Sequence, residues 1–150
     1  MSAIVRAATL ADLDVLAALF DAYRVFYEMP SDIAGARAFL EARIRADESA
    51  LFLAFDGDEA LGFTQLYPSF SSTGLGRLWI LNDLFVLPTA RRTGAGNALM
   101  AAAERHARIT GTVGVMLSTA HSNATAQRLY TSRGYVHDEN FRDYYLMFER

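Results

Sequence analysis

The chain has 150 residues, of which 52% are hydrophobic, so it has enough apolar surface for one core, and we expect a single domain over residues 1–150. Its formal net charge of -3 argues against a nucleic-acid partner and favours a small cationic one, and the absence of cysteine excludes disulfides, thiolate metal ligands and a cysteine nucleophile. The longest apolar stretches are far shorter than a membrane span and the N-terminus does not resemble a signal peptide, so we expect a cytoplasmic protein with no membrane partner.

The first third of the chain carries one strand signal and two helix signals. Residues 3–8 predict a short strand, and Thr9 followed three residues later by Asp12 resembles a capping box that opens a helix. A proline ends this helix, so residues 26–30 are expected to form a loop, and Ser31 is expected to cap a second helix. Apolar side chains recur at helical spacing in the first helix, at Leu13, Leu16, Ala17, Phe20, Tyr23 and Tyr27. In the second helix, Ile33, Leu40 and Ile44 are expected to face inward.

Three strand-like runs follow the helices. The runs at 51–55 and 60–67 are separated by a short segment with an Asp-Gly pair, which is a strong hairpin signal. A polar loop is expected at 69–74. The run at 77–86 carries apolar residues on both faces, which indicates the buried middle of a sheet.

A glycine-rich turn, Arg91-Arg92-Thr93-Gly94-Ala95-Gly96, lies between this third run and a helix expected at 94–110. The start of a helix leaves its first N–H groups unpaired, glycines let an anion approach the backbone, and arginines add charged donors. The segment alone is equally compatible with a tight structural turn. It lacks the third glycine of a dinucleotide fingerprint, and no Gly-Lys-Ser/Thr follows, so we expect a different phosphate-bearing ligand.

The last part of the chain predicts a strand at 113–118, a helix at 123–133 and two terminal strands at 135–136 and 144–148. The whole pattern predicts an α+β fold in the order β-α-α-β-β-β-α-β-α-β-β. We therefore expect one mixed, mostly antiparallel sheet of about seven strands with about four helices, antiparallel in its first half.

Two ordered motifs resemble those of a known family. They are Arg91-x-x-Gly94-x-Gly96 and Asn123-x-x-Ala126-x-x-Leu129-Tyr130-x-x-x-Gly134-Tyr135. With these motifs and this order of elements, the chain resembles the GNAT acetyltransferase superfamily over essentially its whole length. The resemblance implies a GNAT-like sheet and a single acyl-CoA N-acyltransferase domain.

The resemblance also implies acetyl-CoA as the cofactor. Backbone N–H groups of the glycine turn would hold the coenzyme A pyrophosphate, helped by an arginine, and the strand before the turn would pair with pantetheine. The residues at the family's cofactor-binding positions are Phe85, Val86, Arg91, Arg92, Thr93, Gly94, Ala95, Gly96, Asn97, Asn123 and Ala126.

Two residues are candidates for catalysis. Tyr130 matches the family's general acid, which protonates the thiolate of coenzyme A as it leaves, and a phenol pKa of about 10 keeps it protonated at neutral pH. Asp83 is the best candidate base, because Asn82-Asp83-Leu84-Phe85-Val86 resembles the Glu-Asp segment of spermidine/spermine acetyltransferases. Asn82 replaces that glutamate, so the proton could instead leave through water, or the amine could enter neutral. The structural alternatives are a core aromatic at Tyr130 and a buried, hydrogen-bonded carboxylate at Asp83.

Substrate contacts are expected from Phe26, Tyr27, Glu28 and Asn82, and from the loop at 69–74. Aromatic rings with one carboxylate suit an alkyl amine through cation–π and charge pairing, although the same residues are compatible with core packing. The 3 histidines lack metal-ligand spacing, so no metal site is expected.

We therefore expect an acetyl-CoA-dependent N-acetyltransferase in which a primary amine of a small molecule attacks the thioester directly. The expected acceptor is a polyamine, a diamine or an amino-acid derivative, and the alternative is a protein lysine or N-terminus. A non-catalytic acyl-CoA-binding regulatory module is the alternative of another class, which the replacement at Asn82 leaves open. By family analogy we expect a homodimer, for which Tyr144 and Tyr145 offer an interface.

Overall fold

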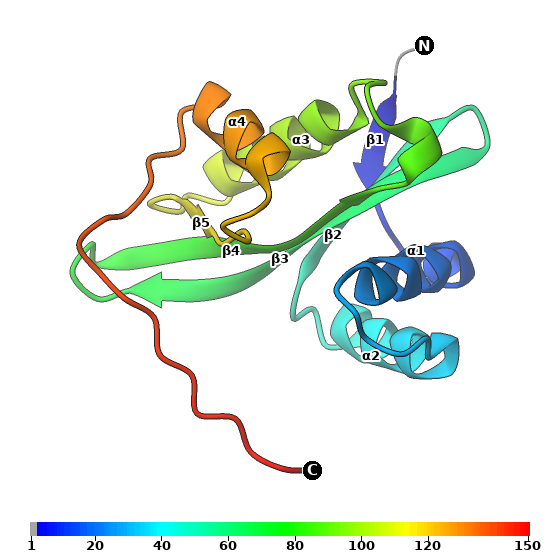
Figure 1. Cartoon of the computed structure of the whole chain (residues 1–150), viewed down its shortest axis with the longest axis horizontal. Coiled ribbons are helices and arrows are strands. Elements are labelled where there is room, and N and C mark those ends of the chain that lie inside the picture. The colour runs from blue at the N-terminus through cyan, green and yellow to red at the C-terminus, as the bar shows by residue number, and fades with distance from the viewer. Residues whose placement is uncertain (1–2) are drawn as a thin grey trace. The chain divides into compact units, whose positions relative to one another are not determined.

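The computed structural model describes residues 3–150 and divides into two compact units, the first ending at Ser118 and the second spanning Thr119–Arg150. Among the described residues, no helix is both long enough and apolar enough to cross a bilayer. The elements, labelled in Figure 1, are β1 (Ile4–Ala7), α1 (Leu13–Phe26), α2 (Ile33–Arg45), β2 (Ala50–Asp56), β3 (Glu59–Ser71), β4 (Gly76–Val86), α3 (Ala95–Ile109), β5 (Val115–Leu117) and α4 (Ala124–Ser132), with short 3-10 turns at Leu10–Asp12 and Pro88–Ala90.

The strands form one five-stranded sheet in the order β1-β2-β3-β4-β5. The first four strands pair antiparallel, and β5 pairs parallel to β4. The expected α+β class, the four helices and the mostly antiparallel sheet are confirmed. The sheet has fewer strands than expected, because the two expected terminal strands are not part of it.

The terminal strands expected at 135–136 and 144–148 are corrected by the structure. The described residues after α4 form no strand. A strand exists only where a neighbouring strand pairs with its backbone, and the apolar pattern at 144–148 finds no such neighbour within the described chain. The apolar pattern indicated that this segment favours a strand, but it could not show whether another strand pairs with it.

Alternate side chains of the sheet contribute to two separate cores in the first unit. Leu53 and Phe63 face α1 and α2 and are fully buried with Leu16 and Leu40 of those helices. The other face packs against α3, where Leu99 is fully buried. Figure 1 shows α1 and α2 on one side of the sheet and α3 on the other. Such alternation is expected of strands that are covered on both faces.

The helix caps agree with the sequence at one position and differ at another. The capping box is confirmed, since the Thr9 N–H donates to Asp12 Oδ2 at 2.8 Å and the Thr9 hydroxyl accepts from the first turn. Ser31 does not cap α2. Its hydroxyl instead donates to Asp21 Oδ2 at 2.7 Å, and Asp32 caps the helix. Either residue type can cap a helix, so the choice depended on the tertiary contact with Asp21.

The buried face of α2 and the end of β3 also differ from the predictions. Ile33 is exposed, because the buried row of α2 consists of Ala36 and Leu40, with Ile44 packed against it. The loop expected at 69–74 is shorter than predicted, since β3 continues to Ser71 and pairs with the start of β4. In both cases packing or pairing with a neighbouring element, rather than local composition, decides the outcome.

Candidate active site

The glycine-rich turn before α3 has an open backbone. Arg92 and Gly94 are left-handed, with φ of 66° and 85°. Between them, the Thr93 hydroxyl donates to Ala90 O at 2.6 Å and accepts the Ala95 N–H at 3.4 Å, which holds the turn in shape. A Cβ built on Gly94 meets nothing within 4 Å among the described residues. The turn and the N-terminus of α3 therefore fit a phosphate-bearing ligand.

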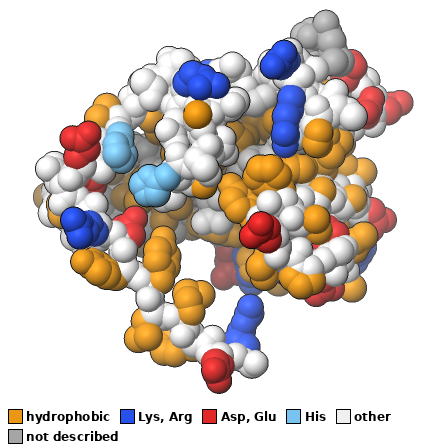
Figure 2. Space-filling model, in the orientation of Figure 1, with side chains coloured by type: hydrophobic (Ala, Val, Ile, Leu, Met, Phe, Trp, Pro, Cys, Tyr) orange, Lys and Arg blue, Asp and Glu red, His pale blue; other side chains and the backbone are white. Residues whose placement is uncertain are grey.

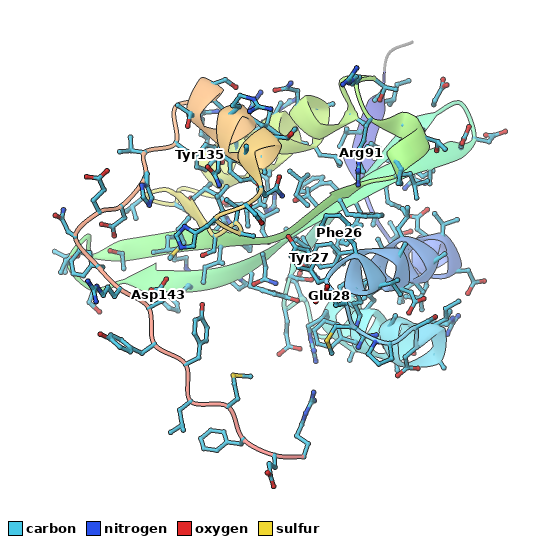
Figure 3. All side chains as sticks on the ribbon, in the orientation of Figure 1. Phe26, Tyr27, Glu28, Arg91, Tyr135 and Asp143 are labelled. Atoms are coloured by element: carbon cyan, nitrogen blue, oxygen red, sulfur yellow. The ribbon has the colours of Figure 1, made fainter. Side chains whose placement is uncertain are left out.

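The two arginines of the turn have different surroundings. The Nε of Arg91 donates to Val86 O at 3.3 Å, and its guanidinium carbon lies 5.8 Å from the centroid of the Phe26 ring. Arg91 therefore connects the turn to the end of α1, as Figure 3 shows. Arg92 is exposed. This difference favours Arg92 as the side chain that could bind an anion.

A bulge in β4 places Asn82 out of register. Gln65 lies opposite Asp83, but the next residue of β3 lies opposite Leu81, which leaves Asn82 as the extra residue. β5 pairs only with the part of β4 that precedes Asn82. Among the described residues, no strand pairs with that side of β4 from Asn82 to Val86. We call this stretch the open edge of β4, and an extended ligand could pair with it.

Asp83 is buried, with 3% of its surface exposed. Its Oδ1 accepts a hydrogen bond from Asn82 Nδ2 at 3.0 Å, and its Oδ2 accepts one from Gln65 Nε2 at 2.7 Å. Burial raises the pKa of the Asp83 carboxyl, and the hydrogen bond from Gln65 opposes this effect. A carboxyl with a raised pKa can accept a proton closer to neutral pH than an ordinary aspartate can.

Gln65 is a site residue that sequence reasoning missed. It is fully buried, and its Oε1 accepts no hydrogen bond from any described residue. The neighbouring Thr64 hydroxyl donates to Asp83 O at 2.8 Å, so both residues brace the same part of β4. An unpaired buried acceptor is costly, and it could accept a hydrogen bond from a bound amine or water. The available signal was a polar Thr-Gln pair inside the apolar run at 60–67.

An aromatic cluster of Tyr23, Phe26, Tyr27 and Phe85 lies where α1 meets β4. The ring centroids are 5.1 Å apart for Tyr23 and Tyr27, 5.2 Å for Phe26 and Tyr27, and 6.3 Å for Phe26 and Phe85. Phe26 and Tyr27 are about half exposed, and the Tyr23 hydroxyl donates to Asn82 O at 3.3 Å. The structure thus brings the predicted substrate residues Phe26, Tyr27 and Asn82 together with Phe85.

Glu28 follows the aromatic cluster at the end of α1. It has a φ of 64°, and its N–H donates to Val25 O at 2.9 Å, which closes the helix. Its side chain is exposed, and Figure 3 shows it beside Tyr27. A carboxylate next to exposed aromatic rings favours a cation at this surface.

The second unit holds the remaining predicted residues on α4. Asn123 Oδ1 accepts the Ala126 N–H at 3.1 Å and so caps the helix. Asn123, Ala126 and Tyr130 recur at spacings of three and four, which places them along one face of α4. Tyr130 is half-buried, with its ring centroid 6.0 Å from that of Tyr135.

Comparisons with known proteins agree with this arrangement. The family model of the acetyltransferase (GNAT) family matches residues 16–135. An uncharacterized N-acetyltransferase of Bacillus subtilis is 46% identical over 142 residues, which cover 95% of each chain. An aminoglycoside N(6')-acetyltransferase of Klebsiella aerogenes is 31% identical over 100 residues, which cover 65% of this chain and 66% of that protein.

A solved structure agrees with the same assignment. The crystal structure of a probable acetyltransferase has a TM-score of 0.91 and 44% identity, covering 98% of this chain and 99% of the other. Both sequence motifs lie where the family resemblance expects them, the glycine turn at the start of α3 and Asn123 at the start of α4. The chain therefore belongs to the GNAT family and is an N-acetyltransferase of that family.

Proposed function

We propose that this N-acetyltransferase moves an acetyl group from acetyl-CoA, by direct attack, onto a primary amine of a small molecule. The observation that carries the proposal is the buried pair Asp83 and Gln65 at the β4 bulge. This pair combines a carboxyl whose pKa is raised by burial with an unpaired amide oxygen. Both groups attract an ammonium, and a perturbed carboxyl is typical of a functional site.

Acetyl-CoA is the proposed cofactor, since GNAT acetyltransferases generally use it. The open glycine turn, with Arg92, Thr93 and Gly94, suits a pyrophosphate, and the open edge of β4 at Phe85 and Val86 suits an amide-bearing arm. When bound, the cofactor supplies the acetyl group as an activated thioester. The other residues proposed to contribute are Arg91, Ala95, Gly96 and Asn97 of the turn, and Asn123 and Ala126 of α4.

The proposed acceptor is a polyamine, a diamine or an amino-acid derivative. Phe26 and Tyr27 would take the cation by cation–π contact, and Glu28 and Asp83 would add negative charge, with Asn82 beside them. The relative from Klebsiella aerogenes is named for acetylating a small-molecule amine, which supports this substrate class at a coarse level.

Two residues are proposed to move protons. Asp83 would take a proton from the amine, directly or through a water shared with Asn82, so that the nitrogen lone pair can attack the acetyl carbon. Tyr130 would deliver a proton to the sulfur as the carbon–sulfur bond breaks. These roles differ because burial makes Asp83 a better proton acceptor, while a phenol is protonated at neutral pH.

We further propose that residues 1–150 act as a single acyl-CoA N-acyltransferase domain. The family model spans residues 16–135, which include Asp83, the glycine turn and Tyr130. A cytoplasmic location and a homodimer belong to the same proposal.

A thiol-release assay tests the proposed function. The chain has no cysteine, so a thiol reagent reports only the coenzyme A that is released. The panel contains polyamines, diamines, amino-acid amides, aminoglycosides and lysine peptides, and mass spectrometry follows the acetylated product. We expect amine-dependent release with at least one small amine. Release with peptides alone would favour a protein acetyltransferase, and tight acetyl-CoA binding without release would favour a non-catalytic module.

A further inference from the structure

Polar side chains continue beyond Asp83 on the face of the sheet that α1 and α2 cover. Gln65 and Tyr67 are two residues apart on β3, so their side chains point to the same face. The antiparallel register of β2 and β3, continued by one residue, puts Ser49 opposite Tyr67. Residues directly opposite each other in such a ladder share a face. Ser49, Tyr67, Gln65 and Asp83 therefore form a line of neighbours, which we call the polar row.

Two members of the polar row have a buried polar atom without a partner. Ser49 Oγ and Gln65 Oε1 form no hydrogen bond with any described residue. Native proteins satisfy nearly all of their buried polar groups, so two unpaired atoms in one row indicate a polar ligand. The amide oxygen can only accept a hydrogen bond, whereas the hydroxyl can also donate one. The row can therefore bind a donor at Gln65 and an acceptor at Ser49.

Tyr67 lies between these two residues in the polar row and is half-buried. Burial, and after it the negative charge of Asp83, raises the pKa of the Tyr67 hydroxyl to about 12, and the positive charge of Arg43 opposes this effect. The phenol is therefore protonated at neutral pH and can donate a hydrogen bond to a ligand.

Arg43 of α2 lies near the Ser49 end of the polar row. Its Nε forms an ion pair at 3.0 Å with Glu48, the residue before Ser49, and its guanidinium carbon lies 4.6 Å from the centroid of the Phe39 ring. A guanidinium has five N–H donors, so its two Nη groups can bind a further anion. Glu48 is exposed, and because an exposed ion pair contributes little, sharing Arg43 with a second carboxylate costs little.

The two ends of the polar row differ in charge. Asp83 and Gln65 offer a carboxyl and an unpaired amide oxygen at one end. Where α1 ends, on the Asp83 side, Figure 2 shows an acidic side chain among apolar ones. Arg43 offers positive charge at the other end, together with the hydroxyls of Ser49 and Tyr67. This arrangement matches a ligand that is positive at one end and negative at the other.

We propose that the acceptor is an amine that also carries a carboxylate, as an amino acid does. Its amine would lie at Asp83 and Gln65, and its carboxylate would accept hydrogen bonds from Ser49, Tyr67 and Arg43. A diamine or a polyamine would instead bring a second positive charge toward Arg43, where like charges repel. This inference rests on the proposed function and selects one of its acceptor classes.

Matched pairs of acceptors test the charge preference. Each pair contains a free amino acid and its carboxamide, which keeps the amine and the side chain but has no negative charge. β-Alanine and 4-aminobutyrate vary the separation of amine and carboxylate, and 1,4-diaminobutane represents the diamines. Thiol release gives kcat/KM, corrected for the fraction of neutral amine. We expect the acids to exceed their carboxamides by about 10-fold or more, as a hydrogen bond between charged groups worth about 1.5–3 kcal/mol implies.

Arg43→Gln tests the proposed carboxylate contact. It should lower kcat/KM for the acids about 10-fold to 100-fold and leave the carboxamides nearly unchanged, because only the acids lose a charged hydrogen bond. Arg43→Lys should recover part of the preference, since it keeps the charge. The matched control is Arg45→Gln on the same helix, where the exposed arginine pairs with Glu41 at 3.2 Å, and it should change neither class.

Ser49→Ala separates binding from stability. The variant removes a buried hydroxyl that has no partner, so the Tm of the free protein should stay the same or rise. The kcat/KM for the acids should nevertheless fall relative to that for the carboxamides, and Tyr67→Phe should act in the same direction. A lower Tm with an unchanged preference for acids would contradict the proposed contact of Ser49.

The remaining outcomes separate this inference from the proposed function. Equal use of acids and carboxamides, a preference for the diamine, or an equal loss for both classes in Arg43→Gln would overturn the carboxylate site and leave the N-acetyltransferase proposal in place. Acetylation of no small amine in the panel would overturn both.

Discussion

Gln65 Nε2 donates a hydrogen bond to Asp83 Oδ2 at 2.7 Å, and both residues are buried. They lie directly opposite each other in the β3–β4 ladder, next to the bulge at Asn82. A residue outside both family motifs therefore holds the carboxyl that we propose as the base. It also influences the proton affinity of that carboxyl, because its hydrogen bond stabilises the charged form.

Gln65→Leu should raise the pKa of Asp83 further. The acid limb of the kcat/KM pH profile should then move to higher pH, and kcat/KM on that limb should fall about tenfold, since a hydrogen bond to a charged group contributes about 1.5 kcal/mol. The control is Thr64→Val, which removes a hydrogen bond to the main chain of Asp83 and leaves the carboxyl contact intact. An equal shift in both variants would contradict the specific role of Gln65.

Asp83→Asn should lower kcat on the order of 10²-fold to 10⁴-fold, with acetyl-CoA affinity unchanged. It should also change how stability depends on pH. Burial raises the folded-state pKa of Asp83 above its ordinary value of 3.8, so ionisation of this group opposes folding as the pH rises above that value. The Tm of the variant relative to wild type should therefore increase as the pH rises above about 4. A constant difference in Tm, or an unchanged pH–rate profile, would remove Asp83 from the proton path.

Tyr130→Phe should lower kcat roughly 10²-fold or more while the Kd for acetyl-CoA stays the same, because only the proton-donating hydroxyl is lost. The control is Tyr135→Phe, which removes the hydroxyl from the neighbouring ring, 6.0 Å away between centroids. Single-turnover kinetics separates the chemical step from binding. Equal losses in both variants would assign Tyr130 a packing role.

Arg92→Ala should weaken coenzyme A binding by about 10-fold to 100-fold, as expected when a charged hydrogen bond worth about 1.5–3 kcal/mol is lost. Arg91→Ala is the comparison, because its side chain contacts Val86 O and Phe26. It should change the KM of the amine more than the Kd of coenzyme A. Calorimetric titration and amine kinetics distinguish the two variants, and the reverse ranking would contradict the assignment.

Short-range signals predicted most of the elements correctly. The Thr9–Asp12 capping box forms as expected, and the Asp56-Gly57 turn joins β2 to β3 with Gly57 at a φ of 58°. These features depend on residues that are close in the chain, so they can be predicted from the sequence without knowledge of the fold. Ser31 was misassigned as a cap because its hydroxyl bonds Asp21, a residue of the preceding helix.

The motif spacing and the hydrophobic pattern were sufficient to predict the family, the fold class and the glycine turn, because each of these is recorded in residues that lie close together in the sequence. The pairing of Gln65 with Asp83 and the contact of Arg91 with Phe26 depend on strand register and helix packing, and only the folded chain could reveal them. Residues 144–148 are a second example of a feature that the sequence could not decide. Their composition predicts a strand, but a strand needs a partner edge, and that edge is a property of the tertiary or quaternary structure.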